Sequence, residues 1–468
     1  MGEALSRLKS FEKTADLVEI RIDGISDLNL EKLLQHPRPQ VIITNRRSGE
    51  GGKFTGSTNE QFEILSEAIK HGTEYIDVEM SWGKEFVKKI LAQSDKTKVI
   101  CSYHNFNDTP SNLTSIYRTI RGTGTHVVKI AVMANDITDN MKVFNLLKKT
   151  RHDRQPVIAF CMGEFGQISR ILADVFGGYL TYASQNAEEI TGPGQLTLDD
   201  LTNIYRIHTL NIRTKVFGLV GNPVSHSKGI YFHNRIFARK KVNAVYLNFL
   251  VTDLKRFIRT FRKYFIGLSI TMPFKEGIIP LLDTIDKKAS SNVVNTVISK
   301  KGRLIGYNTD LSAIVRILMK RTNLKKRKVV VLGTGATSKT MAYAAVANGA
   351  QTTIIGRSAK KARILAEELH CDWGTFEDFP PVQADVLMNG TSIGMSTPNH
   401  SDAVSEKIQL VPKNYFRKGM IVMDAVYNPP MTPLLKEAQR AGCKVITGVE
   451  LFEEQAHLQS KIFLKVFQ

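Results

Sequence analysis

The chain repeats one pattern along most of its length, in which a short apolar run is followed by a longer amphipathic segment. This alternation is typical of βα units, whose parallel strands are covered by helices. Strand-like runs between residues 16 and 208 are Asp16–Arg21, Val41–Arg46, Tyr75–Glu79, Lys98–Ser102, Val127–Val132, Pro156–Cys161 and Tyr179–Ser184. A TIM-type (β/α)8 barrel needs one strand more than these runs supply. We therefore predict such a barrel whose first strand is missing or precedes a misassigned start.

A new series of strand-like runs begins at Val216, after a segment over Leu201–Arg213 that is typical of a terminal helix and a short basic connection. We therefore place a domain boundary near residue 212. The runs up to about residue 310 predict one α/β lobe, and a second lobe opens at Lys328 with the sequence KVVVLG. Its rhythm predicts a doubly wound sheet, so we expect an α/β chain with domains at 1–212 and 213–468.

Composition agrees with two or three folded, soluble units, since the 468 residues are 42% hydrophobic and 23% charged. The net charge of +20 is spread over both halves, so we expect neither nucleic acid nor a membrane as partner. A charged N-terminal segment and the lack of a long apolar run favour a cytoplasmic location. Reduced thiols and no metal site are expected, because the cysteines are far apart: Cys101, Cys161, Cys371 and Cys443.

Lys129 lies inside the apolar run His126–Val132, where an ammonium group is costly to bury. Such a lysine can lose its proton near neutral pH and attack a carbonyl to form an imine. The alternative is a structural lysine paired with a carboxylate. His104 follows another strand and can transfer protons if a carboxylate such as Glu79 orients it, or it can simply cap a turn. Polar residues at several strand ends, where a barrel has its active site, favour the catalytic interpretation.

A larger set of ordered motifs comprises Asp16–Asp23, Arg46 with Glu50–Gly52, Ser102–Phe106, Val128–Ala131, Met162–Arg170 and Pro193–Gln195. Over residues 4–208 these motifs resemble the type I 3-dehydroquinate dehydratases. The resemblance implies that Lys129 forms an imine with the substrate ketone, that His104 is the general acid and base, and that Arg170 holds the substrate carboxylate. Further substrate contacts are implied for Glu19, Arg21, Arg46, Glu79, Thr191 and Gln195. One departure is Thr191-Gly-Pro-Gly-Gln195, where the family usually has Ser-Ala-Pro-Gly-Gln.

The second lobe begins with an apolar strand that runs into Gly333-Thr-Gly335 and then a helix. This arrangement lets backbone N–H groups meet a pyrophosphate, but Ser338 occupies the third fingerprint position, so a plain strand-to-helix turn remains open. The next strand ends in Gly356-Arg-Ser-Ala-Lys-Lys361, where an NAD enzyme would place an acid. We therefore predict NADP(H) as cofactor. The residues expected to bind it are Gly333, Gly335, Ala336, Arg357, Ser358, Lys361, Ala425 and Gly448.

The second half carries its own motifs, which are Ser225-His-Ser227, Thr271–Lys275, Asn295-Thr296, Gly306–Asp310, Asn389–Met395, Asp424–Pro429, Thr432–Leu435 and Gly448–Gln455. Over residues 215–468 they resemble the shikimate dehydrogenases. The resemblance implies Lys275 and Asp310 as the catalytic pair. Substrate contacts are implied for Ser225, Ser227, Thr271, Asn295, Tyr427 and Gln455. Departures are Ser227-Lys-Gly-Ile for the usual Ser-Lys-Ser-Pro, and Gly356 where Asn is frequent.

The resemblance also divides the second half. A substrate lobe is expected over about 213–312, joined by a C-terminal helix at 450–468 that folds back onto it, and a Rossmann-like NADP lobe over about 313–449. We predict a bifunctional enzyme that dehydrates 3-dehydroquinate and reduces the resulting 3-dehydroshikimate to shikimate with NADPH. Two alternatives stay open: a dehydrogenase acting mainly on quinate, and a non-catalytic sensor or repressor that keeps both pockets.

Overall fold

The computed structural model describes residues 1–11, 15–225, 227–287, 289, 291–377, 379, 384–396 and 410–468. The chain divides into two compact units, Met1–Thr214 and Lys215–Gln468. The boundary lies two residues beyond the position expected from the sequence. Among the described residues, no helix is both long and apolar enough to span a membrane.

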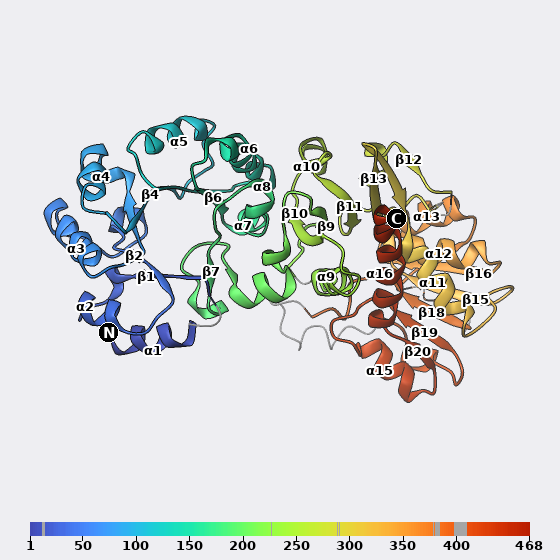
Figure 1. The fold of residues 1–468 in the computed structure, drawn as a ribbon. Helices are drawn as coiled ribbons and strands as arrows, with labels where there is room; N and C mark the ends of the chain where they lie inside the picture. Colours follow the sequence, from blue (N-terminus) through green and yellow to red (C-terminus); the bar gives the residue numbers. More distant parts are fainter. Residues whose placement is uncertain are drawn as a thin grey trace. The chain divides into compact units, whose positions relative to one another are not determined.

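The first unit is built on a parallel sheet whose six strands follow one another in chain order. Its strands are β1 (Leu17–Arg21), β2 (Gln40–Thr44), β3 (Tyr75–Glu79), β4 (Lys98–Asn105), β5 (Val127–Met133) and β6 (Val157–Met162). Helices cover the outside of the curved sheet (Figure 1): α2 (Leu30–Gln35), α3 (Thr58–Lys70), α4 (Lys84–Leu91), α5 (Leu113–Arg121) and α6 (Asn140–Thr150). The remaining helices are α1 (Gly2–Phe11), α7 (Gln167–Ile171) and α8 (Ala173–Phe176).

The seventh predicted strand is much shorter than expected. Tyr179 donates one backbone hydrogen bond to the Val157 carbonyl of β6, and the chain then leaves the sheet. Only β7 (Ala183–Ser184) remains, and it pairs with β8 (Leu196–Thr197) in a separate two-stranded ribbon. In the described residues the sheet is therefore an open, barrel-like half rather than a closed ring, because its edge strands β1 and β6 are not paired to each other.

The terminal helix expected within Leu201–Arg213, before a short basic connection, is also broken. A π-helical turn covers Asp200–Ile204 and a 3-10 turn covers Ile207–Thr209. Arg206 between them has a left-handed backbone with φ of 52°. A continuous helix cannot pass through such a residue.

The second unit contains two sheets. The first has the order β10-β9-β11-β13-β14-β12, with strands β9 (Lys215–Gly221), β10 (Ala244–Leu250), β11 (Phe265–Ile270), β12 (Thr284–Ile285), β13 (Thr296–Lys300) and β14 (Arg303–Tyr307). Helices α9 (Gly229–Arg239) and α10 (Leu254–Phe261) accompany it. The apolar run that begins at Val293 forms a strand only from Thr296, and β13 turns back into β14 as an antiparallel hairpin. Strands β12 and β14 were not predicted from the sequence.

The second sheet is parallel throughout, with the order β17-β16-β15-β18-β19-β20. Its elements are β15 (Lys328–Leu332), α12 (Ala336–Ala347), β16 (Gln351–Gly356), α13 (Ala359–Leu369), β17 (Asp372–Thr375), β18 (Val386–Asn389), β19 (Ile421–Asp424), α15 (Pro433–Arg440) and β20 (Lys444–Ile446). Strand order reverses on the two sides of β15, as in the doubly wound folds that the rhythm predicts.

Two helices connect the lobes of this unit, α11 (Thr309–Met319) and α16 (Gly448–Leu464), and they pack against each other (Figure 1). Helix α16 also contacts α9, β11 and β13 of the first lobe. Its Phe463 is fully buried and packs against Phe217 of β9, with the ring centroids 5.0 Å apart and the rings tilted by 45°. The C-terminal segment thus belongs to the core of the first lobe, as expected from its predicted return.

Candidate functional sites

Lys129 lies in the middle of β5 and only 4% of its surface is exposed. Its Nζ donates to Asp77 Oδ2 at 2.8 Å and lies 3.5 Å from Glu19 Oε1. Burial disfavours the charged form, but the carboxylates of Asp77 and Glu19 outweigh it and raise the pKa of Lys129 above its usual value. The sequence-based expectation of a lysine that is neutral near pH 7 is therefore wrong for the free site. The amine becomes nucleophilic only when a proton is passed on.

Asp77 is the centre of the buried charge network around this lysine. It accepts hydrogen bonds from Lys129 and from Ser102 Oγ at 2.6 Å, and it forms an ion pair with Arg46 at 2.9 Å. Burial opposes its ionisation, but the charges of Arg46 and Lys129 outweigh burial and lower the pKa of Asp77. Asp77 lies in the middle of the predicted strand Tyr75–Glu79, and no role was predicted for it from the sequence.

His104 lies on β4 and its Nδ1 is 2.9 Å from Glu50 Oε2. Glu79, the carboxylate expected to orient it, instead binds the Arg47 amide, Trp82 Nε1 at 2.6 Å and Arg46. The expectation fails because Glu50 follows β2 in a turn that no strand periodicity describes. Burial, with help from the Arg46 charge, lowers the pKa of His104 to about 4. The imidazole is therefore neutral at pH 7, and its Nε2 has no hydrogen bond to the described residues.

Arg170 lies on α7 and 2% of its surface is exposed. Its guanidinium lies 4.2 Å above the Phe160 ring, and its hydrogen bond to the Pro193 carbonyl is long at 3.4 Å. The buried Nε has no hydrogen-bond partner, and no ion pair joins Arg170 to any described carboxylate. Burial lowers the pKa of this arginine to about 10. A buried cation with open donors is suited to bind an anion.

The other residues predicted to contact the substrate in the first unit include several that make hydrogen bonds within that unit. Gln195 Oε1 accepts from the amide and hydroxyl of Thr191, at 2.9 and 3.0 Å, so the departing motif still closes its own turn. Glu19 accepts from Thr44 at 2.8 Å. Arg21 binds Asp23 with two donors at 2.9 Å each and reaches the Gly51 carbonyl at 3.3 Å, beside the Glu50 turn.

Lys275 and Asp310 form the central pair of the second unit. Nζ of Lys275 donates to Asp310 Oδ2 at 2.7 Å, and the two side chains are 16% and 13% exposed. Lys275 follows β11, whereas Asp310 lies in the first turn of α11. Asn308 caps that helix by accepting from the Leu311 amide, which fixes the position of Asp310. The pair can hold and deliver a proton while remaining partly open to solvent.

The predicted substrate contacts of this unit fall into two groups. Asn295 Nδ2 donates to Thr309 Oγ1 at 2.9 Å, and Thr309 Oγ1 lies 3.4 Å from Gln455 Oε1 on α16. Gln459, one turn further, donates to the Asn295 carbonyl at 3.2 Å and fixes it in place. Neither Thr309 nor Gln459 was identified from the sequence.

The second group lies around the start of α9. Ser227 Oγ accepts from the Gly229 amide at 3.1 Å, and Ser225 lies just before it, exposed. The Lys228 ammonium lies 5.9 Å from the ring centroid of Tyr427, which reaches this group from the other lobe. Thr271 donates its amide to the Val220 carbonyl at 2.9 Å, at the end of β9.

The nucleotide fingerprint forms a tight turn between β15 and α12. Gly333 has φ of +101°, and a Cβ there would lie 2.6 Å from Ser338 Oγ, so only glycine fits. Gly335 is the N-cap of α12, which Ala336 begins, and no atom approaches within 4 Å of a Cβ added at Gly335. This open, N–H-rich helix start fits a pyrophosphate. Ser338 is buried and donates to the Leu332 carbonyl at 3.0 Å, so the unusual residue closes the turn.

The cationic residues follow the neighbouring strand at the same edge of the sheet. Arg357 is exposed directly after β16, and Ser358 caps α13 by accepting from the Lys361 amide at 3.4 Å. A Cβ at Gly356 would lie 2.7 Å from Thr334 Cγ2, which explains the glycine where asparagine is frequent. These residues fit a 2′-phosphate. Ala425 donates to the Asn389 carbonyl at 2.9 Å, and Gly448 lies against the Val426 carbonyl without room for a side chain.

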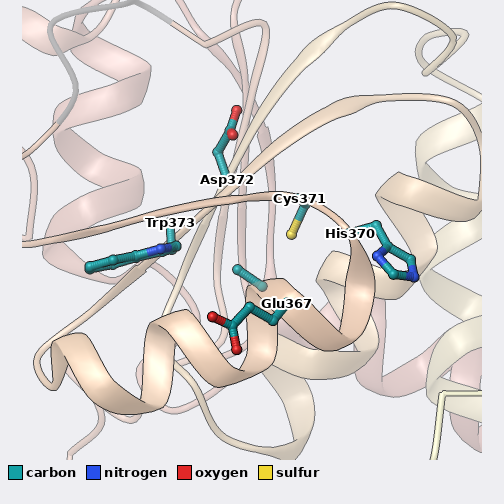
Figure 2. Close-up of a pocket in the computed structure, with 6 residues that line it drawn as sticks. Glu367, His370, Cys371, Asp372 and Trp373 are labelled. Atoms are coloured by element: carbon teal, nitrogen blue, oxygen red, sulfur yellow. The ribbon is translucent and has the colours of Figure 1, made fainter.

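A surface pocket elsewhere in this lobe contains none of the predicted site residues. Figure 2 shows its lining, which consists of Ala366, Glu367, His370, Cys371, Asp372 and Trp373. It lies between the end of α13 and the start of β17. Arg357 follows the end of the neighbouring parallel strand β16, so the pocket and Arg357 lie at opposite ends of the strands. Burial raises the pKa of the Cys371 thiol to about 11, so it is protonated and unreactive at neutral pH. No group of three or more His, Cys, Asp or Glu residues in the described part of the chain is arranged to hold a metal ion.

The fold and the two clusters together define a two-part enzyme, with a buried lysine site in a barrel-like unit and a nucleotide-dependent dehydrogenase site in the other. Sequence profiles agree: the Type I 3-dehydroquinase profile matches residues 1–212, the Shikimate dehydrogenase substrate binding domain matches 219–297, and Shikimate / quinate 5-dehydrogenase matches 316–407.

Individual relatives of the chain agree with these matches. A "Bifunctional 3-dehydroquinate dehydratase/shikimate dehydrogenase, chloroplastic" from Arabidopsis thaliana is 37% identical over 97% of this chain and 78% of its own length. "Shikimate biosynthesis protein AroDE" from Chlamydia pneumoniae is 28% identical over 99% and 93%. "Shikimate dehydrogenase (NADP(+))" from Pyrococcus abyssi is 37% identical over 54% and 93%.

The chain belongs to the family of bifunctional 3-dehydroquinate dehydratase/shikimate dehydrogenases. It is a shikimate-pathway enzyme that acts on small molecules, with a lyase half and an NADP-dependent oxidoreductase half.

Proposed function

We propose that residues 1–212 dehydrate 3-dehydroquinate through an imine on Lys129, and that residues 213–468 reduce the product at the Lys275–Asp310 pair. The single observation that carries the first assignment is the buried Arg170, which lacks a carboxylate partner among the described residues. Leaving such a charge unpaired is costly unless an anionic substrate binds to it. Asp77, at 2.8 Å, is positioned to accept a proton from Lys129 as the ketone is attacked.

His104 is proposed as the base and acid of this half. Its Nδ1 faces the Glu50 carboxylate, so Nδ1 carries the hydrogen and the Nε2 lone pair can accept a proton from the substrate carbon. The same imidazole then returns that proton to the departing hydroxyl, so water leaves and the base is regenerated. Arg46 and Asp77 hold the surrounding charges in place, while Thr191 and Gln195 close the loop beside Arg170.

In the second half, Lys275 is proposed to donate a proton to the ketone oxygen, with Asp310 keeping the ammonium charged and placed. Gly333, Gly335, Ala336, Arg357, Ser358 and Lys361 would hold NADPH, which supplies the hydride when bound. Ala425 and Gly448 would contact the cofactor in the same lobe, which spans about residues 313–449. Asn295 and Gln455 would bind the substrate's hydroxyls, and Ser225 and Ser227 its carboxylate, in the lobe over about 213–312 with the helix at 450–468.

A coupled assay tests both halves together. Protein mixed with 3-dehydroquinate and NADPH should lose nicotinamide absorbance and accumulate shikimate, and NADH should support the reaction more weakly because Arg357 replaces an acid. If 3-dehydroshikimate supplied directly consumes no NADPH, the assignment of the second half is wrong. If 3-dehydroshikimate consumes NADPH but 3-dehydroquinate does not, the assignment of the first half is wrong.

The pH profile tests the role of His104. Because its pKa is lowered to about 4 and the base must be neutral, kcat/KM of the dehydratase should rise with a midpoint near pH 4 rather than 6.5. Glu50→Gln should lower this midpoint further, since the Glu50 carboxylate favours the imidazolium. A midpoint near 6.5 in the parent protein would contradict the buried, neutral imidazole.

The proposed reactions require neither nucleic acid nor a membrane. A cytoplasmic site of action stays a prediction, because the Arabidopsis relative carries the word chloroplastic in its name. Cell fractionation with the coupled assay as readout would decide between the two compartments.

A further inference from the structure

Tyr182 is a residue of the first unit that neither the sequence motifs nor the mechanism above uses. It lies just before β7, in the segment where the seventh strand was expected. Its hydroxyl is buried and has no hydrogen-bond partner among the described residues. Native proteins rarely leave such a group unsatisfied, because a lost hydrogen bond is not replaced by water.

The ring of Tyr182 connects the two ends of the proposed substrate site. Lys129 Nζ lies 4.5 Å from its ring centroid. On its other side, Tyr182 is 6.0 Å from the ring of Phe160, over which the Arg170 guanidinium lies at 4.2 Å. A ligand whose ketone reaches Lys129 and whose carboxylate reaches Arg170 must therefore pass Tyr182.

Packing alone does not account for the hydroxyl. The apolar cluster that Tyr182 joins consists of side chains such as Ile158, Phe160 and Met162. Phenylalanine would fill the same volume and keep the cation–π contact with Lys129, without burying an unpaired polar atom. The phenolic group thus has a cost in the free protein that a ligand contact would offset.

We infer that Tyr182 is a further catalytic residue of the dehydratase half, whose phenol donates a hydrogen bond to the ketone oxygen of the ligand while Lys129 attacks the adjacent carbon. The inference rests on the proposed imine at Lys129. Burial keeps the phenol protonated, because it raises the pKa of Tyr182 well above its usual value. A donor at this place stabilises the negative charge that develops on the oxygen.

The step balances without any other reactant. The Lys129 nitrogen forms a bond to the carbonyl carbon, and the π electrons move to the oxygen, which Tyr182 hydrogen-bonds. The nitrogen lone pair then expels this oxygen as water. Both protons of that water come from the Lys129 ammonium, one of them by way of Asp77, and the product is a protonated imine with Tyr182 still a phenol.

Tyr182→Phe tests the inference, with the rate of borohydride trapping on Lys129 as readout in single-turnover mixing. Loss of a hydrogen bond to a developing charge should slow trapping by about 10- to 100-fold. Because 3-dehydroquinate and 3-dehydroshikimate present the same ketone, both ligands should be slowed equally. The melting temperature of the free variant should stay level or rise, since an unpaired buried hydroxyl has been removed.

The matched control is Tyr75→Phe on β3, in the same apolar cluster. The Tyr75 hydroxyl is bonded to that of Tyr179 at 2.7 Å, so its removal should lower the melting temperature and leave the trapping rate unchanged.

Three results would overturn the assignment. If Tyr182→Phe is trapped at the rate of the parent protein, Tyr182 is not the hydrogen-bond donor. Slowing with 3-dehydroquinate alone would place the hydroxyl on the leaving group, which the product lacks. A clear fall in melting temperature would show that the hydroxyl has a structural partner. Failure of the proposed function is distinct, because the parent protein itself would then not be trapped.

Discussion

Lys129→Arg is expected to abolish the dehydration of 3-dehydroquinate, with kcat falling by more than about 10⁴-fold, because a guanidinium cannot form the imine. The reduction of 3-dehydroshikimate by NADPH should continue at the parental rate, since Lys129 and Lys275 belong to different compact units. Product formation from each substrate, measured separately on the same preparation, checks both halves.

The choice of arginine guards against a folding artefact. Asp77 is buried and contacts Lys129 at 2.8 Å, so a neutral replacement would leave its charge partly uncompensated and cost about 3–5 kcal/mol. Arginine keeps a positive charge beside Asp77. Circular dichroism and a melting curve should resemble those of the parent. Residual activity within tenfold of the parent would show that the reaction does not pass through a covalent intermediate on this residue.

Lys275→Met is expected to lower kcat of the dehydrogenase by about 10²- to 10⁴-fold, because the proton donor to the developing alkoxide is lost. The affinity for NADPH should stay close to that of the parent protein, because the residues predicted to bind the cofactor lie beyond residue 330, in the other lobe of the unit. Initial rates with 3-dehydroshikimate, together with calorimetric titration of NADPH, separate the two effects.

Arg321→Met is the matched control, because Arg321 also pairs with a carboxylate of this unit, Glu450 at 2.7 Å, but lies just beyond the C-terminal end of α11, whereas Asp310 lies in its first turn. It should cost little, as partly exposed pairs contribute about 0–1 kcal/mol to stability. Equal losses of kcat in the two variants would mean that Lys275 supports the fold and not the chemistry.

Much of the first site was predictable because parallel strands end at one edge of a sheet. Glu19, Asp77 and Lys129 are polar residues in otherwise apolar runs, and His104 closely follows another such run. The ionisation of Lys129 was not predictable. Burial and nearby carboxylates shift its pKa in opposite directions, and their balance depends on distances such as the 2.8 Å to Asp77.

Functional residues outside the observed strands were not predicted for a different reason. Glu50 lies in a turn outside the strands that the apolar pattern marks, and Tyr182 lies in a predicted strand that does not form, so nothing in the periodicity indicates which way either side chain faces. The Glu50-Gly-Gly52 motif drew attention to the turn, but the partner of His104 emerged only from the geometry. For Tyr182, the only signal would have been a polar group in an aromatic, apolar run.

In the second unit, the rhythm of strands predicted two lobes but not the β13–β14 hairpin. That hairpin turns at Lys301 and Gly302, both with left-handed backbones, and the sequence there is simply polar and basic. The role of Ser338 was also not predictable, since only the geometry shows that its hydroxyl donates a hydrogen bond to the Leu332 carbonyl across the turn.

The return of α16 to the first lobe has a consequence for how the protein is made. Residues 1–214 have all their contacts available once they leave the ribosome, and they can fold while synthesis continues. The lobe that begins at Lys215 cannot finish folding then, because Phe463 completes its core around Phe217 and Gln459 holds Asn295. A nascent chain therefore carries a folded dehydratase half well before its dehydrogenase half can finish folding. The dehydrogenase half can do so only after translation has passed Phe463.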